Sequence, residues 1–316
     1  MPLSNAFIHA LRVVTENAAL AAFDWVGRGE KELGDGAAVD AMRDALARIP
    51  VCGEIVIGEG EKDEAPHLFR GERIGCLERE PEWDIAVDPV EGTTFLAHGL
   101  AGSMAVIGLA PRGTMFDPGP AFYMEKLVVC GPARGKVDPR WPPEQIVAAV
   151  AEAMKKPVED VTVFVLDKPR HRDLVARLRA TGCRVSLQAA GDVAGALLAA
   201  ITESPVDILM GTGGTPEGVL VAGAVNALGG DMFGRLDPQR PDEAAAVAEA
   251  GLDTTRWYGL DELTSSNDTL FCATGITSGH LCSGIDRTAK LDRIQTLLIS
   301  GRTRERQLLT TWRARN

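Results

Sequence analysis

The 316-residue sequence contains no apolar run long enough to cross a membrane. Its longer apolar runs, such as MAVIGLA at 104–110, fall well short of the roughly 18 residues that a spanning helix needs. The N-terminal residues also lack the basic patch and following apolar block that are typical of a signal peptide. We therefore expect a cytoplasmic protein with no signal peptide and no membrane partner.

Positive charge is also scarce in this sequence. The chain has 33 Lys and Arg residues against 44 Asp and Glu residues, which gives a formal net charge of -11. This balance opposes generic binding to nucleic acid or to an anionic membrane surface. If the ligand of this protein is itself an anion, a local group must reverse the field around it.

Cysteines are few and far apart, and no two of them form a C-x-x-C pair. The six residues are Cys52, Cys76, Cys130, Cys183, Cys272 and Cys282. In a chain of this size the pattern favours buried, reduced thiols over a disulfide or zinc framework. The rest of the composition, 45% hydrophobic and 24% charged, is that of an ordinary globular protein. Its length suggests about two domains.

The first part of the chain mixes helical and strand patterns. Apolar residues recur every three or four positions from Phe7 to Trp25, which predicts an amphipathic helix with Ser4 as its N-cap. The charged, glycine-rich segment 27–36 predicts a loop, and 37–49 predicts a second helix. We assign residues 1–140 to a first, α+β domain. Short apolar runs predict strands at 54–60, 84–88, 104–111 and 125–131.

The pattern changes near WPPEQ at 141–145, after which short apolar runs alternate with helical segments. Such alternation is typical of right-handed βαβ units, whose ligands bind at the carboxyl ends of the strands. Residues 270–281 and 295–302 return to strand character. We therefore expect an α/β protein of two layered domains. The second, 141–316, would be a substrate-binding βαβ domain, with part of the C-terminus packed back on the first.

Carboxylates follow several of the predicted strands directly. Glu59 follows IVIG, Asp88 follows IAV with Glu91 three residues on, and Glu217 follows ILMGTGGTP. A single D-P-x-E segment is more often a turn or a helix N-cap. Several such groups together repel one another and need protons or cations. Because no His or Cys accompanies them, the ligands would be oxygen atoms only, which suits Mg²⁺ or Mn²⁺ in a metal-carrying first domain.

Two glycine-containing turns accompany these acids. Gly92 lets the backbone approach a ligand closely, and Thr93 either orients an attacking water or serves as an ordinary turn hydroxyl. Gly213 and Gly214 precede Pro216 at the start of a predicted helix, where backbone amides and the helix dipole would face an anion.

A basic cluster follows the predicted strand VTVFVL. In a protein of charge -11, Lys168, Arg170, His171 and Arg172 form either a phosphate clamp or a solvated helix start.

The stretch DPVEGTTFLAHG resembles the D-P-x-D-G-T signature of the lithium-sensitive, metal-dependent phosphatases, which include inositol monophosphatases and fructose-1,6-bisphosphatases. The resemblance is closer to the class II fructose-1,6-bisphosphatases of bacteria and covers almost the whole chain. It is carried, in order, by GRGEKELGDGAAVDAMR, IVIGEGEKDEAPHLF, IAVDPVEGT, FYMEKL, KPRH, GDVA, GGTPEGV and ATGIT.

The resemblance implies a two-domain sugar-phosphatase fold, a Mn²⁺ or Mg²⁺ cofactor, a homodimer or homotetramer, and hydrolysis of fructose 1,6-bisphosphate. It implies the metal ligands Asp35, Glu59, Asp88, Glu91 and Glu217. It implies the catalytic residues Thr93, Glu59, Lys31 and Asp63. It implies the substrate contacts Glu91, Gly92, Thr93, Tyr123, Lys168, Arg170, Asp192 and Gly214.

One departure from the family pattern bears on the substrate. Where many relatives read D-G-D, this chain reads Ala190-Gly191-Asp192, so a carboxylate expected near the sugar hydroxyls is missing. This departure bears on the identity of the sugar and on the efficiency of the reaction. Beside fructose 1,6-bisphosphate we expect sedoheptulose 1,7-bisphosphate as a second substrate. Two alternatives stay open at this point: an inositol- or nucleotide-type monophosphatase, and a non-catalytic protein that binds sugar phosphates.

Overall fold

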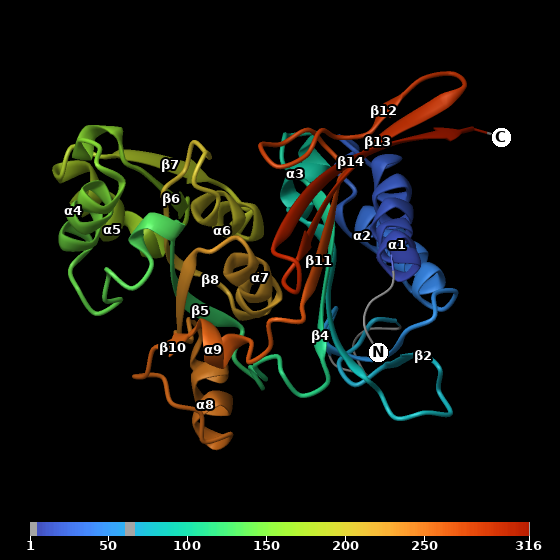
Figure 1. Cartoon of the computed structure of the whole chain (residues 1–316), viewed down its shortest axis with the longest axis horizontal. Coiled ribbons are helices and arrows are strands. Elements are labelled where there is room, and N and C mark those ends of the chain that lie inside the picture. Colours follow the sequence, from blue (N-terminus) through green and yellow to red (C-terminus); the bar gives the residue numbers. More distant parts are fainter. Residues whose placement is uncertain (1–4, 61–66, 316) are drawn as a thin grey trace. The chain divides into compact units, whose positions relative to one another are not determined.

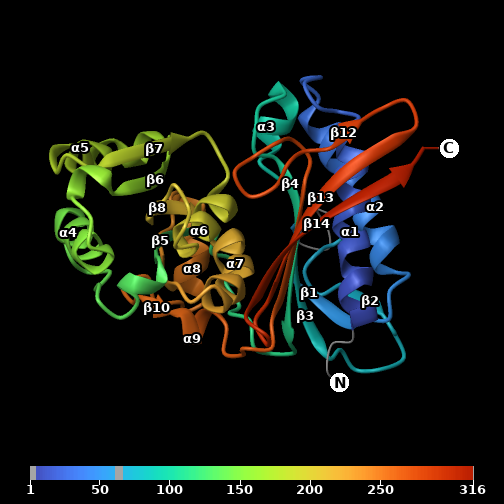
Figure 2. The ribbon, with the colours of Figure 1, turned by 45° about the horizontal axis from the view of Figure 1, so that its top comes forward.

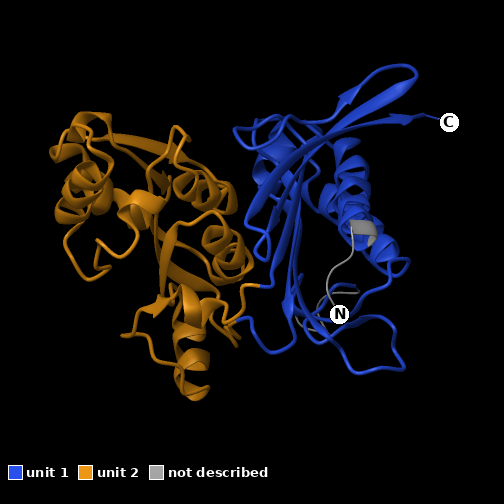
Figure 3. Ribbon diagram, viewed as in Figure 1, with its two compact units in different colours: residues 1–115, 268–316 blue, residues 116–267 orange. Residues whose placement is uncertain are grey.

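The computed structural model describes residues 5–60 and 67–315, and the chain forms two compact units (Figure 3). One unit comprises residues 1–115 and 268–316, and the other comprises residues 116–267. The first boundary therefore lies at 115/116 instead of near 140. The difference arises because the strand expected at 125–131 pairs within the second unit.

Two helices of the first unit, α1 (Asn5–Phe23) and α2 (Lys31–Leu46), lie along its sheet (Figures 1 and 2). The third, α3 (Thr93–His98), follows β3 (Trp83–Glu91) and contacts α2. The expected N-cap, Ser4, lies outside the described residues. The prediction of a loop at 27–36 is wrong, because α2 already begins at Lys31. Gly34 lies inside this helix at a point of close packing, where a Cβ would lie 2.6 Å from a methyl carbon of Leu96 and 3.0 Å from the Cβ of Trp25.

The sheet of the first unit combines strands from both ends of the chain. Its strands are β1 (Cys52–Ile57), β2 (Arg73–Gly75), β3 (Trp83–Glu91), β4 (Met104–Pro111), β11 (Leu270–Gly275), β12 (Asp286–Arg287), β13 (Leu291–Ser300) and β14 (Glu305–Ala314). Along the sheet the order is β12-β13-β11-β4-β3-β1-β2, and β14 pairs with β13. β1 and β3 are parallel, and the other pairs are antiparallel.

Alternating strand residues of this sheet meet the apolar faces of α1 and α2 in a single core. Members of this core include Leu11, Val14, Met42, Leu46, Ile55, Ile85, Val87, Ile107, Leu109, Cys272, Ile294 and Leu298. Their period of two along the strands, and of three to four along the helices, is the period that defined the predicted elements. The core therefore fixes the position of the end of β3, where the acidic residues begin.

The second unit has its own sheet, in the order β10-β9-β5-β8-β6-β7. Its strands are β5 (Tyr123–Val129), β6 (Thr162–Leu166), β7 (Arg184–Gln188), β8 (Ile208–Gly214), β9 (Asp231–Leu236) and β10 (Tyr258–Gly259). Its helices are α4 (Pro143–Met154), α5 (Arg172–Ala180), α6 (Asp192–Ala200), α7 (Thr215–Ala227), α8 (Pro241–Glu249) and α9 (Leu260–Leu263), with short 3-10 turns at Gly131–Ala133, Val158–Asp160 and Pro169–His171. β6 is parallel to β7 and to β8, with α5 and α6 as the connecting helices. This is the expected βαβ arrangement.

The prediction that all six cysteines are reduced is wrong for one pair, because Cys52 and Cys76 form a disulfide. β1 and β2 pair with Cys52 opposite Gly75, which places the two Cα atoms 4.9 Å apart. The sequence separation of 24 gave no sign of this pairing. The other four cysteines are free and buried, and burial raises the pKa of Cys272 and of Cys282 to about 12.

None of the helices in the part of the chain that the structure describes has the length and apolar character needed to span a bilayer.

Candidate active site

The end of β3 brings two carboxylates together. In a regular strand Asp88 and Glu91 would point to opposite faces, since they are three residues apart. The pairing with β4 shifts here: Asp88 lies opposite Val106, but Glu91 lies opposite Met104, so β3 has one residue more than its partner over this stretch. As a result, one carboxylate oxygen of Asp88 and one of Glu91 lie within 4.8 Å of each other. Two negative charges at this distance favour a bound cation.

The turn after this pair depends on glycine. Gly92 has a φ of +79°, in the left-handed region, and a Cβ there would lie 2.8 Å from the ring of Phe95. This conformation lets the Gly92 carbonyl accept the backbone N–H of Phe95 at 2.8 Å, which starts α3. Thr93 is then the first residue of α3, and it is half-buried beside the acidic pair in sequence.

Four other residues of the first unit were predicted to belong to the site. Among the described residues, Asp35 and Glu59 are not within the same 4.8 Å group. Asp35 is half-buried on α2, where burial and then the charge of Glu32 raise the pKa of its carboxyl. Glu59 lies two residues past β1, where its backbone N–H donates to the carbonyl of Leu68. Lys31 is exposed at the start of α2, and Asp63 lies outside the described residues.

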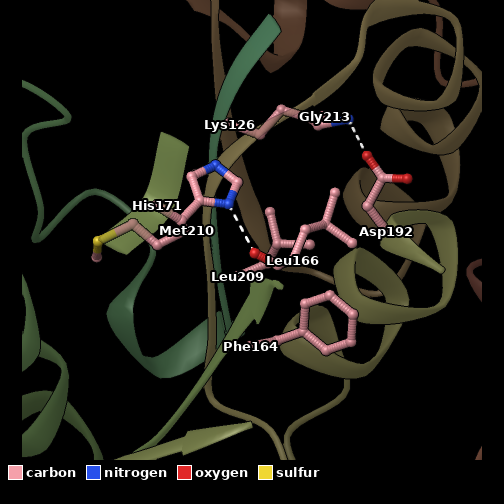
Figure 4. Close-up of a pocket in the computed structure, with 9 residues that line it drawn as sticks. Lys126, Phe164, Leu166, His171, Asp192, Leu209, Met210 and Gly213 are labelled. Carbon is pink, nitrogen blue, oxygen red and sulfur yellow. Dashed lines mark hydrogen bonds and ion pairs between the residues drawn. The ribbon is translucent and has the colours of Figure 1, made fainter. Parts of the chain in front are cut away.

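A buried ion pair organises the site of the second unit (Figure 4). The Lys126 ammonium on β5 is paired with the carboxylate of Asp192, the first residue of α6, and their side chains are 2% and 8% exposed. The same ammonium donates to the carbonyl oxygen of Gly214 at 2.6 Å. One lysine thus fixes two residues that the sequence predicts to contact substrate. The sequence analysis did not identify Lys126. A lysine inside the largely apolar strand YMEKLVV could have indicated a buried charge that needs a partner.

The glycine pair in GTGGTPEG is required by this arrangement. A Cβ on Gly213 would lie 2.1 Å from Oδ2 of Asp192, and one on Gly214 would lie 1.7 Å from Oε2 of Glu217. No side chain fits at either position without moving a carboxylate. The two glycines therefore let the strand end approach the acidic groups closely.

Glu217 carries a carboxylate whose surroundings favour a bound cation. Its Oε2 atom is buried and makes no hydrogen bond to the residues that the structure describes. Burial is the largest cause that raises the pKa of Glu217; the Asp192 charge raises it further, and Lys126 opposes the rise. An oxygen of this kind is costly to leave ionised without a proton or a cation. The oxygen-only donor set fits a hard divalent ion.

The basic cluster after β6 divides into exposed and buried parts. Arg170 is exposed; it donates from Nε and Nη2 to the carbonyl of Thr212 at 3.1 and 2.8 Å, and its guanidinium lies 5.1 Å from the ring centroid of Tyr123. Lys168 is half-buried just ahead of it. The Arg170 guanidinium is therefore held in place by Thr212 and Tyr123. A fixed guanidinium is suited to binding a phosphate.

His171 does not belong to the exposed cluster that the sequence suggested, because its side chain is buried. Its Nε2 accepts the backbone N–H of Thr212 at 2.8 Å, so Nδ1 carries the proton and donates to the carbonyl of Leu166 at 2.7 Å. Burial, more than the Arg170 charge, lowers the pKa of His171. The neutral ring therefore joins the end of β6 to β8 by binding the N–H of Thr212, the residue whose carbonyl accepts from Arg170.

A small cavity of about 10 Å³ adjoins these groups and is lined in part by Lys126, His171 and Asp192 (Figure 4). That volume is about enough for one water molecule, and far too small for a sugar. Ala190 is half-buried two residues before Asp192, where a relative with D-G-D would present a second carboxylate.

Comparisons with known proteins agree with these observations. A protein-family model described as "Bacterial fructose-1,6-bisphosphatase, glpX-encoded" matches residues 5–313. The chain is 42% identical to the class 2 fructose-1,6-bisphosphatase 1 of Escherichia coli K12, over 92% of this chain and 90% of that protein. The class 2 enzyme of Shigella flexneri gives the same identity and coverage.

Similarity to solved structures is weaker. An inositol monophosphatase from Anabaena matches with 14% identity and a TM-score of 0.33, over 79% of this chain and 97% of that one. The family match defines the class as metal-dependent phosphatases. Within this class, the chain belongs to the family of bacterial, glpX-encoded fructose-1,6-bisphosphatases.

Proposed function

We propose that this protein hydrolyses fructose 1,6-bisphosphate to fructose 6-phosphate and phosphate. The single observation that carries the proposal is the family match over residues 5–313, together with relatives named class 2 fructose-1,6-bisphosphatase at 42% identity. The inositol-type and non-catalytic alternatives are not favoured by this match. A cytoplasmic location and a homodimer or homotetramer remain proposals from the sequence.

The cofactor of this proposal is Mn²⁺ or Mg²⁺. The residues that would hold it are Asp35, Glu59, Asp88, Glu91 and Glu217. Support comes from the closely spaced oxygens of Asp88 and Glu91. It comes also from the buried Oε2 of Glu217, which has no hydrogen-bond partner within residues 5–60 and 67–315. When bound, divalent cations neutralise phosphate oxygens, lower the pKa of an attacking water and stabilise a leaving alkoxide.

The protein's own side chains then position the reactants. Thr93, with Glu59, would orient the attacking water in line with the 1-phosphate, while Gly92 lets that phosphate approach the backbone. Lys31 and Asp63 are assigned catalytic roles by the same resemblance.

The phosphate far from the reaction would be held by the basic residues of the second unit. Lys168 and Arg170 would bind it, and Tyr123 would support the Arg170 guanidinium through the contact between their planar groups. Such remote binding energy helps to hold the reacting phosphate in place. Asp192 and Gly214, both held by Lys126, would contact the sugar.

Sedoheptulose 1,7-bisphosphate is the proposed second substrate. A carboxylate that accepts hydrogen bonds from sugar hydroxyls can discriminate between chain lengths, and Ala190 cannot do so. We therefore expect a narrower preference for fructose over sedoheptulose than in relatives that keep the carboxylate.

The test is phosphate release from fructose 1,6-bisphosphate with Mn²⁺, with Mg²⁺ and with EDTA, beside sedoheptulose bisphosphate and inositol 1-phosphate. We expect release from the bisphosphates that depends on the metal and falls by orders of magnitude in Asp88→Asn. The matched control is Asp286→Asn, whose carboxylate is 61% exposed on β12 and should leave the rate unchanged. Undiminished turnover by Asp88→Asn would remove that metal ligand from the mechanism.

A further inference from the structure

β14 forms an open edge of the sheet in the first unit. It pairs with β13 over all ten of its residues, from Glu305 opposite Ser300 to Ala314 opposite Leu291. Within residues 5–60 and 67–315, its other edge has no strand partner. Figures 1 and 2 both show β14 beside β13, leading to the C-terminal end of the chain. A long edge strand without a partner is a template for pairing with another strand.

The backbone groups on this edge have a defined pattern. The N–H of Arg315 donates to the carbonyl of Lys290, so the backbone of Arg315 faces β13. Because backbone direction alternates along a strand, the other odd-numbered residues of β14 also face β13. The backbone groups of the even-numbered residues, 306 to 314, therefore point away from β13 toward the open edge.

The side chains on β14 separate into two faces. Thr311 and Arg313 point to one face, where both donate hydrogen bonds to Glu16 of α1. Leu308 and Trp312 point to the other face and are 53% and 63% exposed. Thr310 lies midway between these two apolar residues. Large apolar side chains exposed on an edge strand are unusual in a protein that stays a monomer.

We propose that β14 pairs antiparallel with β14 of a second copy of this chain, with Thr310 opposite Thr310 on the two-fold axis. In this register Leu308 lies opposite Trp312 of the second copy, and the symmetry repeats that pair. All the outward backbone groups fall in hydrogen-bonded pairs, because even-numbered residues lie opposite even-numbered residues. The two exposed apolar residues thus become each other's partners.

Charge supports the same register. Glu305 lies opposite Arg315 of the second copy, and this pair also occurs twice. Arg306 lies opposite Ala314, and Gln307 lies opposite Arg313, so no two like charges face each other. Within its own chain Glu305 accepts from the hydroxyl of Thr303, and Arg315 lies 3.8 Å from Asp292, so these pairs at the ends contribute less than the apolar pairs.

A cysteine placed on the axis tests the register. In a hydrogen-bonded antiparallel pair the Cα atoms are about 5.5 Å apart, within the range of about 4.4 to 6.8 Å that a disulfide spans. Thr310→Cys should therefore form a covalent dimer under mild oxidation. In the matched variant Arg306→Cys, the two introduced cysteines would lie about 27 Å apart, since they are offset by eight residues. We expect at least tenfold slower cross-linking of this variant in non-reducing gels.

Sedimentation measures the assembly of the uncoupled protein. Wild type should have the mass of a dimer or of a larger even assembly. Leu308→Lys with Trp312→Lys places like charges opposite each other and should raise the dissociation constant at least about tenfold, whereas Leu308→Glu with Trp312→Lys should keep the assembly. Leu77→Lys, at an exposed leucine outside β14, is the control for added charge. Circular dichroism confirms that each variant is folded.

A monomeric wild type would overturn the proposal. So would an assembly that survives the double lysine variant, or equal cross-linking of Thr310→Cys and Arg306→Cys. None of these readouts depends on phosphatase activity.

Discussion

The buried lysine of the second unit gives the sharpest test of how this site is held together. Lys126 is 2% exposed and faces the Asp192 carboxylate, the Gly214 carbonyl and the charge of Glu217. Lys126→Met keeps a long, flexible side chain of similar length but removes the ammonium. Two carboxylates and a carbonyl would then lose their shared cation in a site with almost no access to water.

The expected cost follows from this burial. Breaking a buried ion pair by removing one partner typically costs about 3–5 kcal/mol, because the remaining charge stays buried. We expect a loss of this size in the free energy of unfolding of Lys126→Met. Adding Asp192→Asn should recover part of the loss, since the stranded negative charge is then gone. The order of stability should therefore be wild type, then the double variant, then Lys126→Met.

Urea unfolding followed by circular dichroism, in EDTA to exclude metal ions, measures these free energies. Arg177→Ala serves as the surface control, because Arg177 and Glu144 form an ion pair whose side chains are both 42% exposed. We expect a much smaller loss there. A loss of less than about 1 kcal/mol for Lys126→Met would refute the assignment of Lys126 as the organiser of this site.

Two further predictions concern His171 and Gly214. Burial lowers the pKa of His171 in the folded protein below its ordinary value of 6.5. As pH falls, the unfolded chain therefore binds a proton at this histidine before the folded protein does. The stability that the neutral ring contributes is complete above pH 6.5 and is lost as pH falls below it. In urea unfolding at pH 8, the free energy of unfolding of His171→Gln should therefore be lower than that of wild type by about 1–3 kcal/mol. This difference should become smaller toward pH 5, and a difference that does not change with pH would contradict the prediction. Gly214→Ala should keep most of the stability but lose phosphate release, since the new Cβ would displace Glu217. Gly259→Ala, where no atom lies within 4 Å of the added Cβ, is its control, and an active Gly214→Ala would show that Glu217 is free to move.

The sequence by itself determined the features that depend on neighbouring residues. Hydrophobic periodicity predicted α1, the strands β3 and β4, and the βαβ units around β6, β7 and β8. These elements were predictable because the local hydrophobic pattern indicates which face of a helix or strand is buried. The sequence around Asp88 and Glu91 also predicted a pair of carboxylates at the end of a strand. A helical start at Lys31 was missed, because glycines normally disfavour a helix and only the contact with Leu96 shows why Gly34 is kept.

Tertiary structure alone decided the features that join distant segments. The Cys52–Cys76 disulfide follows from the register of β1 on β2, and the place of β5 follows from its pairing with β8 and β9. Lys126 meets Asp192 across 66 residues, and His171 meets Thr212 across 41. Such pairings depend on which segments pack against each other, and local propensity carries no information about that choice.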